Sequence, residues 1–364
     1  MSSRGSALIV ICLLAGTVCG TIVWLARSPG SGSAGKSPPA PVNRFTVAPT
    51  SAPVPGTNAV DLYRQAIPLL TELRSNAVDQ EQYDRYVDGA FDAQTIAFLQ
   101  KHAKITELIR QGAAATTANW GEMDMPSRLT ELNSIRSLFN LVMIESRFAM
   151  HEGNTAVALE DALAGMTLAH HLGQNGMLTS KMVEIACDTQ AIYVIAHLLQ
   201  SLTSDQLTLL SERLVALPKP GTGAQMMAAE FAYARTQRSG MLSSTMVNSM
   251  ESFYKDAGVA LDTKSPAEFD KWIDAEVPKY VLNPPVKILT PSLKKIRRSL
   301  AVVETNRALL NAAIRVESEG ESAVAKSVDP FGTGPFQYRK TSIGFTLSSQ
   351  LHSDDKAVEL VIGN

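Results

Sequence analysis

Residues 129–144 have the sequence LTELNSIRSLFNLVMI, in which a large apolar residue recurs at every third position. These apolar residues are Leu129, Leu132, Ile135, Leu138, Leu141 and Ile144. Such spacing gathers the apolar side chains on one face of an α-helix. The stretch therefore predicts a long helix that packs this face into a protein core.

The same helical spacing continues on both sides, from Asn58 to about Lys326. Further helices are expected after Asn58, over 93–110, after Asn154, and over 178–202, 204–217, 225–238, 241–257, 266–277 and 291–319. Residues 153–164 look like one helix of a tetratricopeptide-type repeat, but no self-similarity at about 34 residues sustains a repeat protein. The expected fold class is mainly α, with an array of packed helical hairpins over 58–328.

Upstream of this body, an uncharged apolar run begins at Ala7 and ends at Ala26. As a helix it would reach about 30 Å, the thickness of the hydrocarbon core of a bilayer. Residues 1–27 are therefore predicted to be a single-pass transmembrane anchor, with a cleaved signal peptide as the alternative. Residues 28–57 are rich in proline, serine and glycine, which predicts a disordered spacer.

The position of the run, next to Arg4 and the terminal amine, favours a cytoplasmic N-terminus. The folded part would then lie on the periplasmic side of the inner membrane. A net charge of -2 gives no field that would attract nucleic acid. Of three cysteines only Cys187 lies outside the apolar run, so no intrachain disulfide is expected in the body.

The last segment, 329–364, changes pattern to three short alternating stretches, 336–339, 344–347 and 358–361, which predict two or three strands in a small antiparallel β-hairpin. It opens with DPFGTGPFQYR, in which Asp329 is expected to cap a stiff turn between Pro330 and Pro335. Adjacent aspartates at 354 and 355 are expected to form a solvated turn.

This opening resembles the D-P-F-x-G-x-P-x-x-Y-R segment of uncharacterised bacterial membrane-anchored helical proteins, with Thr333 where their pattern has its glycine. It is more distantly similar to the C-terminal part of type II secretion major pseudopilins. In pseudopilins a calcium-binding loop follows and a cleavage signature precedes the membrane helix. This chain has neither a glycine between Ser348 and Lys356 that could bend such a loop nor the signature before residue 7, which argues against a processed pilin subunit.

Two clusters are candidate sites, and neither forms a complete catalytic motif. His170 and His171 could meet Glu184 and Asp188 if their helices pack antiparallel, and such groups can hold a metal ion. The strongest basic cluster is expected near the start of the helix over 291–319, where it could bind anionic lipid heads or an acidic partner. It comprises Lys294, Lys295, Arg297 and Arg298.

Three glutamates on apolar helices, each with an arginine nearby in the sequence, are expected to form ion pairs between helices. They are Glu145, Glu230 and Glu304.

The expected function is that of an envelope-tethered, non-catalytic interaction or scaffold protein that binds another protein or a second copy of itself. No cofactor is expected. Two alternatives stay open at this point: a metal-assisted hydrolase that uses the histidine and carboxylate cluster, and a pseudopilin-like assembly component.

Overall fold

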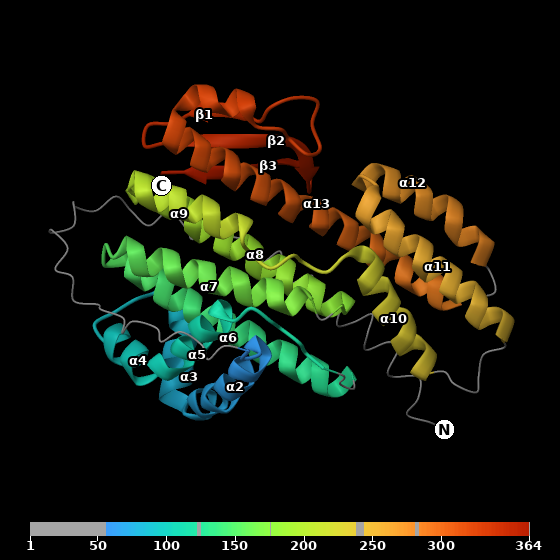
Figure 1. Ribbon diagram of the computed structural model, residues 1–364, viewed down its shortest axis with the longest axis horizontal. Coiled ribbons are helices and arrows are strands. Elements are labelled where there is room, and N and C mark those ends of the chain that lie inside the picture. Colours follow the sequence, from blue (N-terminus) through green and yellow to red (C-terminus); the bar gives the residue numbers. More distant parts are fainter. Residues whose placement is uncertain (1–55, 122–124, 175, 238–243, 281–283, 364) are drawn as a thin grey trace.

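The computed structural model describes residues 56–121, 125–174, 176–237, 244–280 and 284–363. The predicted anchor over 7–26 and nearly all of the spacer lie outside the described residues. The first described helix carries the label α2 (Figure 1).

The described chain is mainly helical, as the apolar spacing predicts, and the larger part of it forms a stack of helices (Figure 1). Its first eight helices are α2 (Ala59–Ser75), α3 (Ala77–Val87), α4 (Thr95–Lys101), α5 (Ala103–Ala114), α6 (Met125–His151), α7 (Thr155–Gly173), α8 (Leu178–Leu198) and α9 (Ser204–Val215). The side chains of Asn58 and Asn154 accept hydrogen bonds from the first-turn N–H groups of Val60 and Val157, so these two predicted helix starts are confirmed.

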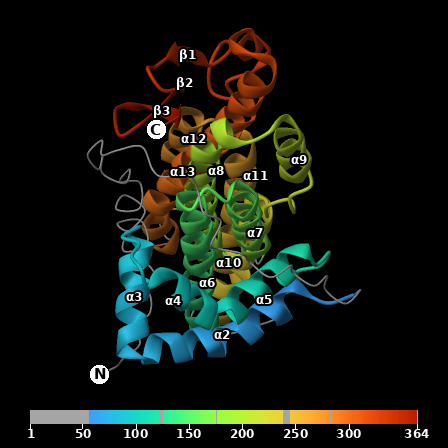
Figure 2. The ribbon, with the colours of Figure 1, turned by 90° about the vertical axis from the view of Figure 1, so that its left-hand side faces the viewer.

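Helices α2 and α5–α8 enclose the larger of two apolar cores. Leu138, Leu141 and Ile144 of α6 are buried there, as the opening pattern predicts. Helix α2 lies at one end of the stack and the sheet at the other (Figure 2). Helix α7 is buried along nearly its whole length, which makes it the centre of this core.

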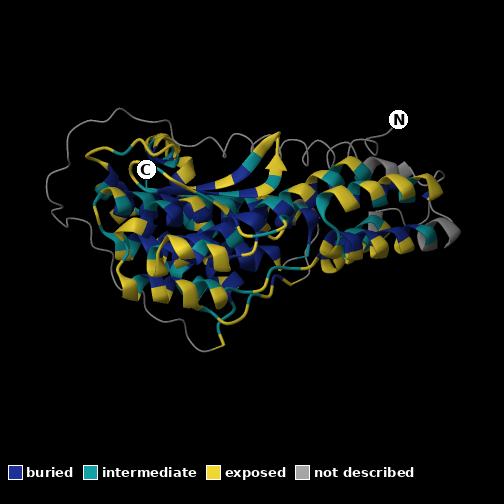
Figure 3. Cartoon of the chain, turned by 90° about the horizontal axis from the view of Figure 1, so that it is seen from above, coloured by how far each residue is buried: buried dark blue, intermediate teal, exposed yellow. Residues whose placement is uncertain are grey.

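A second apolar core lies beside the first, in an extension of the molecule (Figures 1 and 3). Its helices are α10 (Gly223–Gln237), α11 (Ser244–Thr263), α12 (Pro266–Glu276) and α13 (Pro284–Glu319). Phe253, Phe269 and Ile273 are fully buried in it. Helix α13 contributes to both cores, because Leu293 belongs to the second and Leu309 to the first.

Helix α13 begins at Pro284, so the prediction that this helix starts at Pro291 is wrong. A proline inside a helix removes one backbone hydrogen bond and normally ends the helix. Here Val286 and Leu293, on either side of Pro291, are fully buried in the second core. Burial of these apolar side chains outweighs the lost hydrogen bond and continues the helix through the proline.

The C-terminal segment forms a three-stranded antiparallel sheet in the order β1-β2-β3. Its strands are β1 (Gln337–Lys340), β2 (Phe345–Ser353) and β3 (Lys356–Ile362). The expected hairpin is therefore present, and each of the three alternating stretches belongs to a strand. In the register Leu347 pairs with Leu360, and both are fully buried in the larger core, so the sheet packs on the helical stack.

One described segment, Leu178–Ser201, is long and apolar enough to cross a membrane, with a mean hydropathy of 1.3. In the structure 72% of its apolar window is buried against other parts of the chain. This burial is typical of the core helix of a globular body, and it is separate from the predicted anchor.

The β2–β3 turn gives a first testable prediction, because Asp354 and Asp355 both adopt positive φ, 50° and 62°. This two-residue turn suits glycine at its second position. We expect Asp355→Gly to raise the free energy of unfolding by about 0.5–1 kcal/mol. Urea unfolding of the full-length protein measures the change. Asp355→Ala is the control, and it should destabilise; equal effects of both substitutions would contradict the explanation.

Candidate functional site

The predicted meeting of histidine and carboxylates occurs in part, at the centre of the helical stack. His170 on α7 contacts Asp188 Oδ1 on α8 through Nε2 at 3.0 Å, and the carbonyl oxygen of Pro218 through Nδ1 at 2.8 Å. Glu184 lies one turn before Asp188 on the same helix, and both carboxylates are fully buried. Three of the four predicted residues therefore share one site.

Two cations that the sequence argument did not include complete this cluster. Arg307 of α13 donates from Nε to Asp188 Oδ2 at 2.5 Å and also reaches Glu184 at 3.4 Å. Lys181 Nζ lies 2.9 and 2.8 Å from the two carboxylate oxygens of Glu184. Burial alone would raise the pKa of Asp188, but the charge of Arg307 and the hydrogen bond from His170 lower it below its usual value.

His171 points away from this cluster and takes part in a different set of contacts. Its Nδ1 is hydrogen-bonded to the Tyr63 hydroxyl at 2.9 Å, and its carbonyl oxygen accepts a hydrogen bond from the Trp120 indole at 2.7 Å. Burial lowers the pKa of His171 to about 4, with a smaller effect from the neighbouring His170. The neutral ring of His171 therefore joins α7 to α2, and its carbonyl oxygen joins α7 to the segment before α6.

The chemistry of the cluster is that of an ion-pair network between helices. Both carboxylates already have cationic partners, which a metal ion would have to displace. Among the described residues, no three or more histidine, cysteine, aspartate and glutamate side chains are arranged to hold a metal ion. Cys187, next to Asp188, is buried, and burial raises the pKa of its thiol to about 12, so at neutral pH it is an unreactive thiol.

The basic cluster lies inside α13, several turns after its start at Pro284, so its predicted position near a helix N-terminus is wrong. Lys294 pairs with Asp274 at 2.7 Å and Arg298 with Asp270 at 2.5 Å, and both acids belong to α12. Arg297 is buried, donates to the carbonyl oxygen of Lys264, and lies over the ring of Phe331. Lys295 remains exposed. Three of the four cations thus join α13 to neighbouring segments.

The segment that opens the C-terminal region is a structural turn anchored by Asp329. This buried carboxylate accepts hydrogen bonds from the Phe331 N–H at 3.1 Å, the Gln350 N–H at 2.7 Å and the Ser349 hydroxyl at 2.9 Å. The predicted capping role is confirmed. The bonds to Ser349 and Gln350 also fix the turn onto strand β2, a contact that the sequence alone did not predict.

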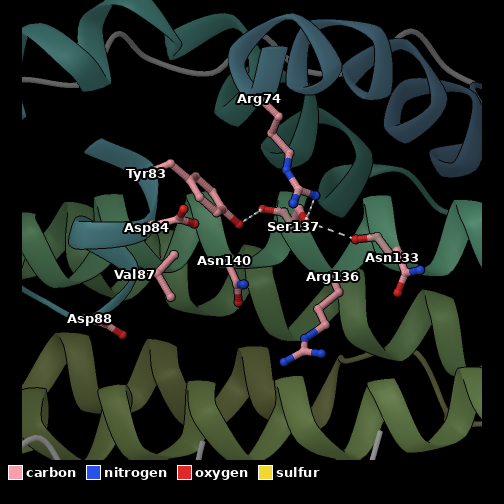
Figure 4. A pocket seen from close by; sticks show the side chains of 9 residues that line it. All are labelled: Arg74, Tyr83, Asp84, Val87, Asp88, Asn133, Arg136, Ser137 and Asn140. Atoms are coloured by element: carbon pink, nitrogen blue, oxygen red, sulfur yellow. Dashed lines mark hydrogen bonds between the residues drawn. The ribbon is translucent and has the colours of Figure 1, made fainter. Parts of the chain in front are cut away.

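A polar cleft lies between α3 and α6, and sequence reasoning missed it. It has a volume of about 550 Å³. Its lining residues are Arg74, Tyr83, Asp84, Val87, Asp88, Asn133, Arg136, Ser137 and Asn140 (Figure 4). We call it the α3/α6 cleft.

A sequence signal for the cleft did exist, within the stretch that predicts α6. Asn133, Arg136, Ser137 and Asn140 recur at helical spacing and form a polar stripe beside the apolar face. A polar stripe is also what a solvated helix face has, so the partner helix α3 was needed to recognise a site.

Tyr83 and Ser137 form the buried floor of the cleft. The Tyr83 hydroxyl donates to the carbonyl oxygen of Ser137 at 3.1 Å, and the Arg74 guanidinium donates to Ser137 Oγ at 3.3 Å and to Gln80 at 3.1 Å. Desolvation raises the pKa of Tyr83, so its hydroxyl stays protonated at neutral pH. The floor is therefore held in place by its own hydrogen bonds.

Comparison of the chain with protein-family models, with curated proteins and with solved structures found no match. The arguments about function that follow therefore depend on the sequence and on the geometry of the described residues.

Proposed function

We propose that this chain is an envelope-tethered, non-catalytic interaction or scaffold protein, anchored in the cytoplasmic membrane by the run over 7–26. The observation that carries the proposal is the order of segments along the chain. An uncharged apolar run comes first, a proline-rich spacer follows, and a helical body begins at Asn58. This order is typical of a body that works at a distance from the membrane surface.

The use of charged side chains in the helical body supports the same proposal. Asp188 and Glu184 pair with basic groups of their own chain, as do the acids opposite the basic cluster. These groups hold helices together, so we assign recognition of a partner protein, or of a second copy, to the outer helical surface.

Membrane fractionation tests the anchor with a matched pair of variants. We expect the intact full-length protein to stay with membranes after a high-salt wash. Leu14→Arg places a charge in the centre of the apolar run, at a cost of roughly 2.5–3.5 kcal/mol for membrane insertion. It should move the protein to the soluble fraction, whereas Ser37→Arg in the spacer should not.

Intact-mass measurement on the membrane fraction separates the remaining alternatives. Retention of the complete N-terminus supports an anchor, and loss of about the first 20 residues would identify a cleaved signal peptide. Loss of only the few residues before the apolar run would identify a processed pseudopilin-like subunit. Recovery of the intact wild-type protein from the soluble cytosol would overturn the proposal.

A further inference from the structure

Charges of opposite sign lie at different parts of the α3/α6 cleft (Figure 4). Asp84 and Asp88 are one turn apart on α3, and Arg74 and Arg136 come from α2 and α6. Figure 4 shows the two aspartates on one side of the cleft and the guanidinium groups of the two arginines on the other.

The two arginines of the cleft differ from most arginines in the helical stack. Arg64, Arg85, Arg110 and Arg307 each form an ion pair with a carboxylate. Among the described residues, neither Arg74 nor Arg136 has a carboxylate within ion-pair distance. Arg74 is nevertheless held in position by its bonds to Ser137 and Gln80. A positioned guanidinium without a carboxylate partner is a ready binding group for an anionic ligand.

The acidic side of the cleft is similarly available to a cation. Asp84 accepts a hydrogen bond from the amide of Gln80 at 2.7 Å, and Asp88 acts on the buried guanidinium of Arg147 only through its charge. Neither aspartate forms an ion pair with any residue in the described part of the chain. Both are exposed at the rim.

Amide and hydroxyl groups lie between the two charged ends. Ser137 and Asn140 line this middle part, Val87 adds a half-buried apolar wall, and Asn133 lies beyond the arginines (Figure 4). Side-chain amides carry both donors and acceptors, which match the N–H and C=O groups of a peptide bond.

We propose that the α3/α6 cleft binds a short peptide of two or three residues in its zwitterionic form. Its C-terminal carboxylate lies against Arg74 and Arg136, and its N-terminal ammonium lies against Asp84 and Asp88. The Asn140 amide binds a peptide bond between these two ends. The cavity volume is within the range of pockets that enclose small ligands. This inference stands on the geometry of the cleft and does not depend on the tether.

Calorimetric titration of the full-length protein with tri-alanine tests the proposal. N-acetyl-tri-alanine lacks the ammonium and tri-alanine amide lacks the carboxylate, so each blocked peptide should bind about tenfold more weakly or worse, as expected for losing one hydrogen-bonded charge. If both blocked peptides bind as strongly as tri-alanine, the assignment is overturned. Absence of tri-alanine binding at millimolar concentration would also overturn it.

Variants of the protein locate the binding. The double variant R74Q/R136Q should bind tri-alanine about tenfold more weakly or worse, while its weak binding of tri-alanine amide changes little. The matched control is Arg339→Gln, an exposed arginine on strand β1, which should bind like the wild type. The unfolding temperature of each variant shows that the fold persists. Unchanged tri-alanine binding by a folded double variant would overturn the proposal.

Discussion

Replacement of Arg307 by methionine is expected to lower the free energy of unfolding by about 3 kcal/mol. Methionine keeps much of the apolar volume of the side chain but removes the charge. Asp188 and Glu184 are both fully buried. Among the described residues, loss of Arg307 leaves Glu184 paired with Lys181 and leaves Asp188 with only its contact to His170. A buried carboxylate without its partner keeps the full cost of its desolvation, which explains the size of the effect.

Urea unfolding of the full-length protein measures this loss, and Glu304→Gln is the matched control. Glu304 lies one turn earlier on α13 and is exposed, so its substitution should change stability by less than about 0.5 kcal/mol. A loss below about 1 kcal/mol for Arg307→Met would mean that the network contributes little. Because the pKa of Asp188 is lowered in the folded state, its full contribution to the free energy of unfolding is present at pH values above its unfolded pKa of about 4. The difference between wild type and variant should therefore shrink as the pH falls below that value.

The composition of this network shows what the sequence could and could not predict. Glu184 and Asp188 are four residues apart on one helix, so their common face followed from spacing alone. Arg307 is 119 positions from Asp188, and no local pattern connects them. His171 turned to the opposite side of α7 because adjacent residues on a helix point in different directions, and this placed it beside Tyr63.

The three glutamates expected to form ion pairs between helices also show that the sequence did not predict their partners. Glu145 forms the predicted pair between helices, but with Arg110 of α5. Glu230 accepts a hydrogen bond from the first N–H of α8, at Leu178, at 2.9 Å. Glu304 is exposed. Apolar surroundings in the sequence indicated which helices are buried, but only the packing of those helices decides which partner a charge meets.

The start of helix α13 and the length of strand β2 also depend on tertiary contacts that the local sequence does not reveal. Proline at 291 favours a helix start locally, and burial of Val286 and Leu293 overrides this preference. The alternation of strand β2 was recognised only as far as Leu347, yet the strand continues to Ser353. It continues because Asp329, from the preceding turn, binds Ser349 and Gln350.

The second large effect is expected at Arg110, where one guanidinium serves two buried carboxylates. Arg110 Nε lies 2.6 Å from Asp161 Oδ1, and its terminal nitrogen lies 2.7 Å from Glu145 Oε1. Arg110→Met leaves Glu145 without a cation and Asp161 without its hydrogen bond in the core, and we expect it to lower the free energy of unfolding by about 4 kcal/mol. Urea unfolding of the full-length protein at neutral pH measures this loss. A loss below about 1 kcal/mol would contradict the assignment.

Asp161→Asn is the informative companion to Arg110→Met. Burial, followed by the negative charge of Glu145, raises the pKa of Asp161 well above its usual value, and Asp161 Oδ2 has no hydrogen-bond partner among the described residues. An amide resembles the protonated carboxyl in shape and charge, so Asp161→Asn should cost about 1 kcal/mol, far less than Arg110→Met. A raised pKa means that the folded state binds more protons than the unfolded state, so this contribution declines as the pH rises through the folded pKa. The stability of the wild type relative to Asp161→Asn should thus fall with rising pH, opposite in sign to the effect of Asp188. A relative stability that rises with pH would show that Asp161 is ionised in the core and that Arg110 neutralises it.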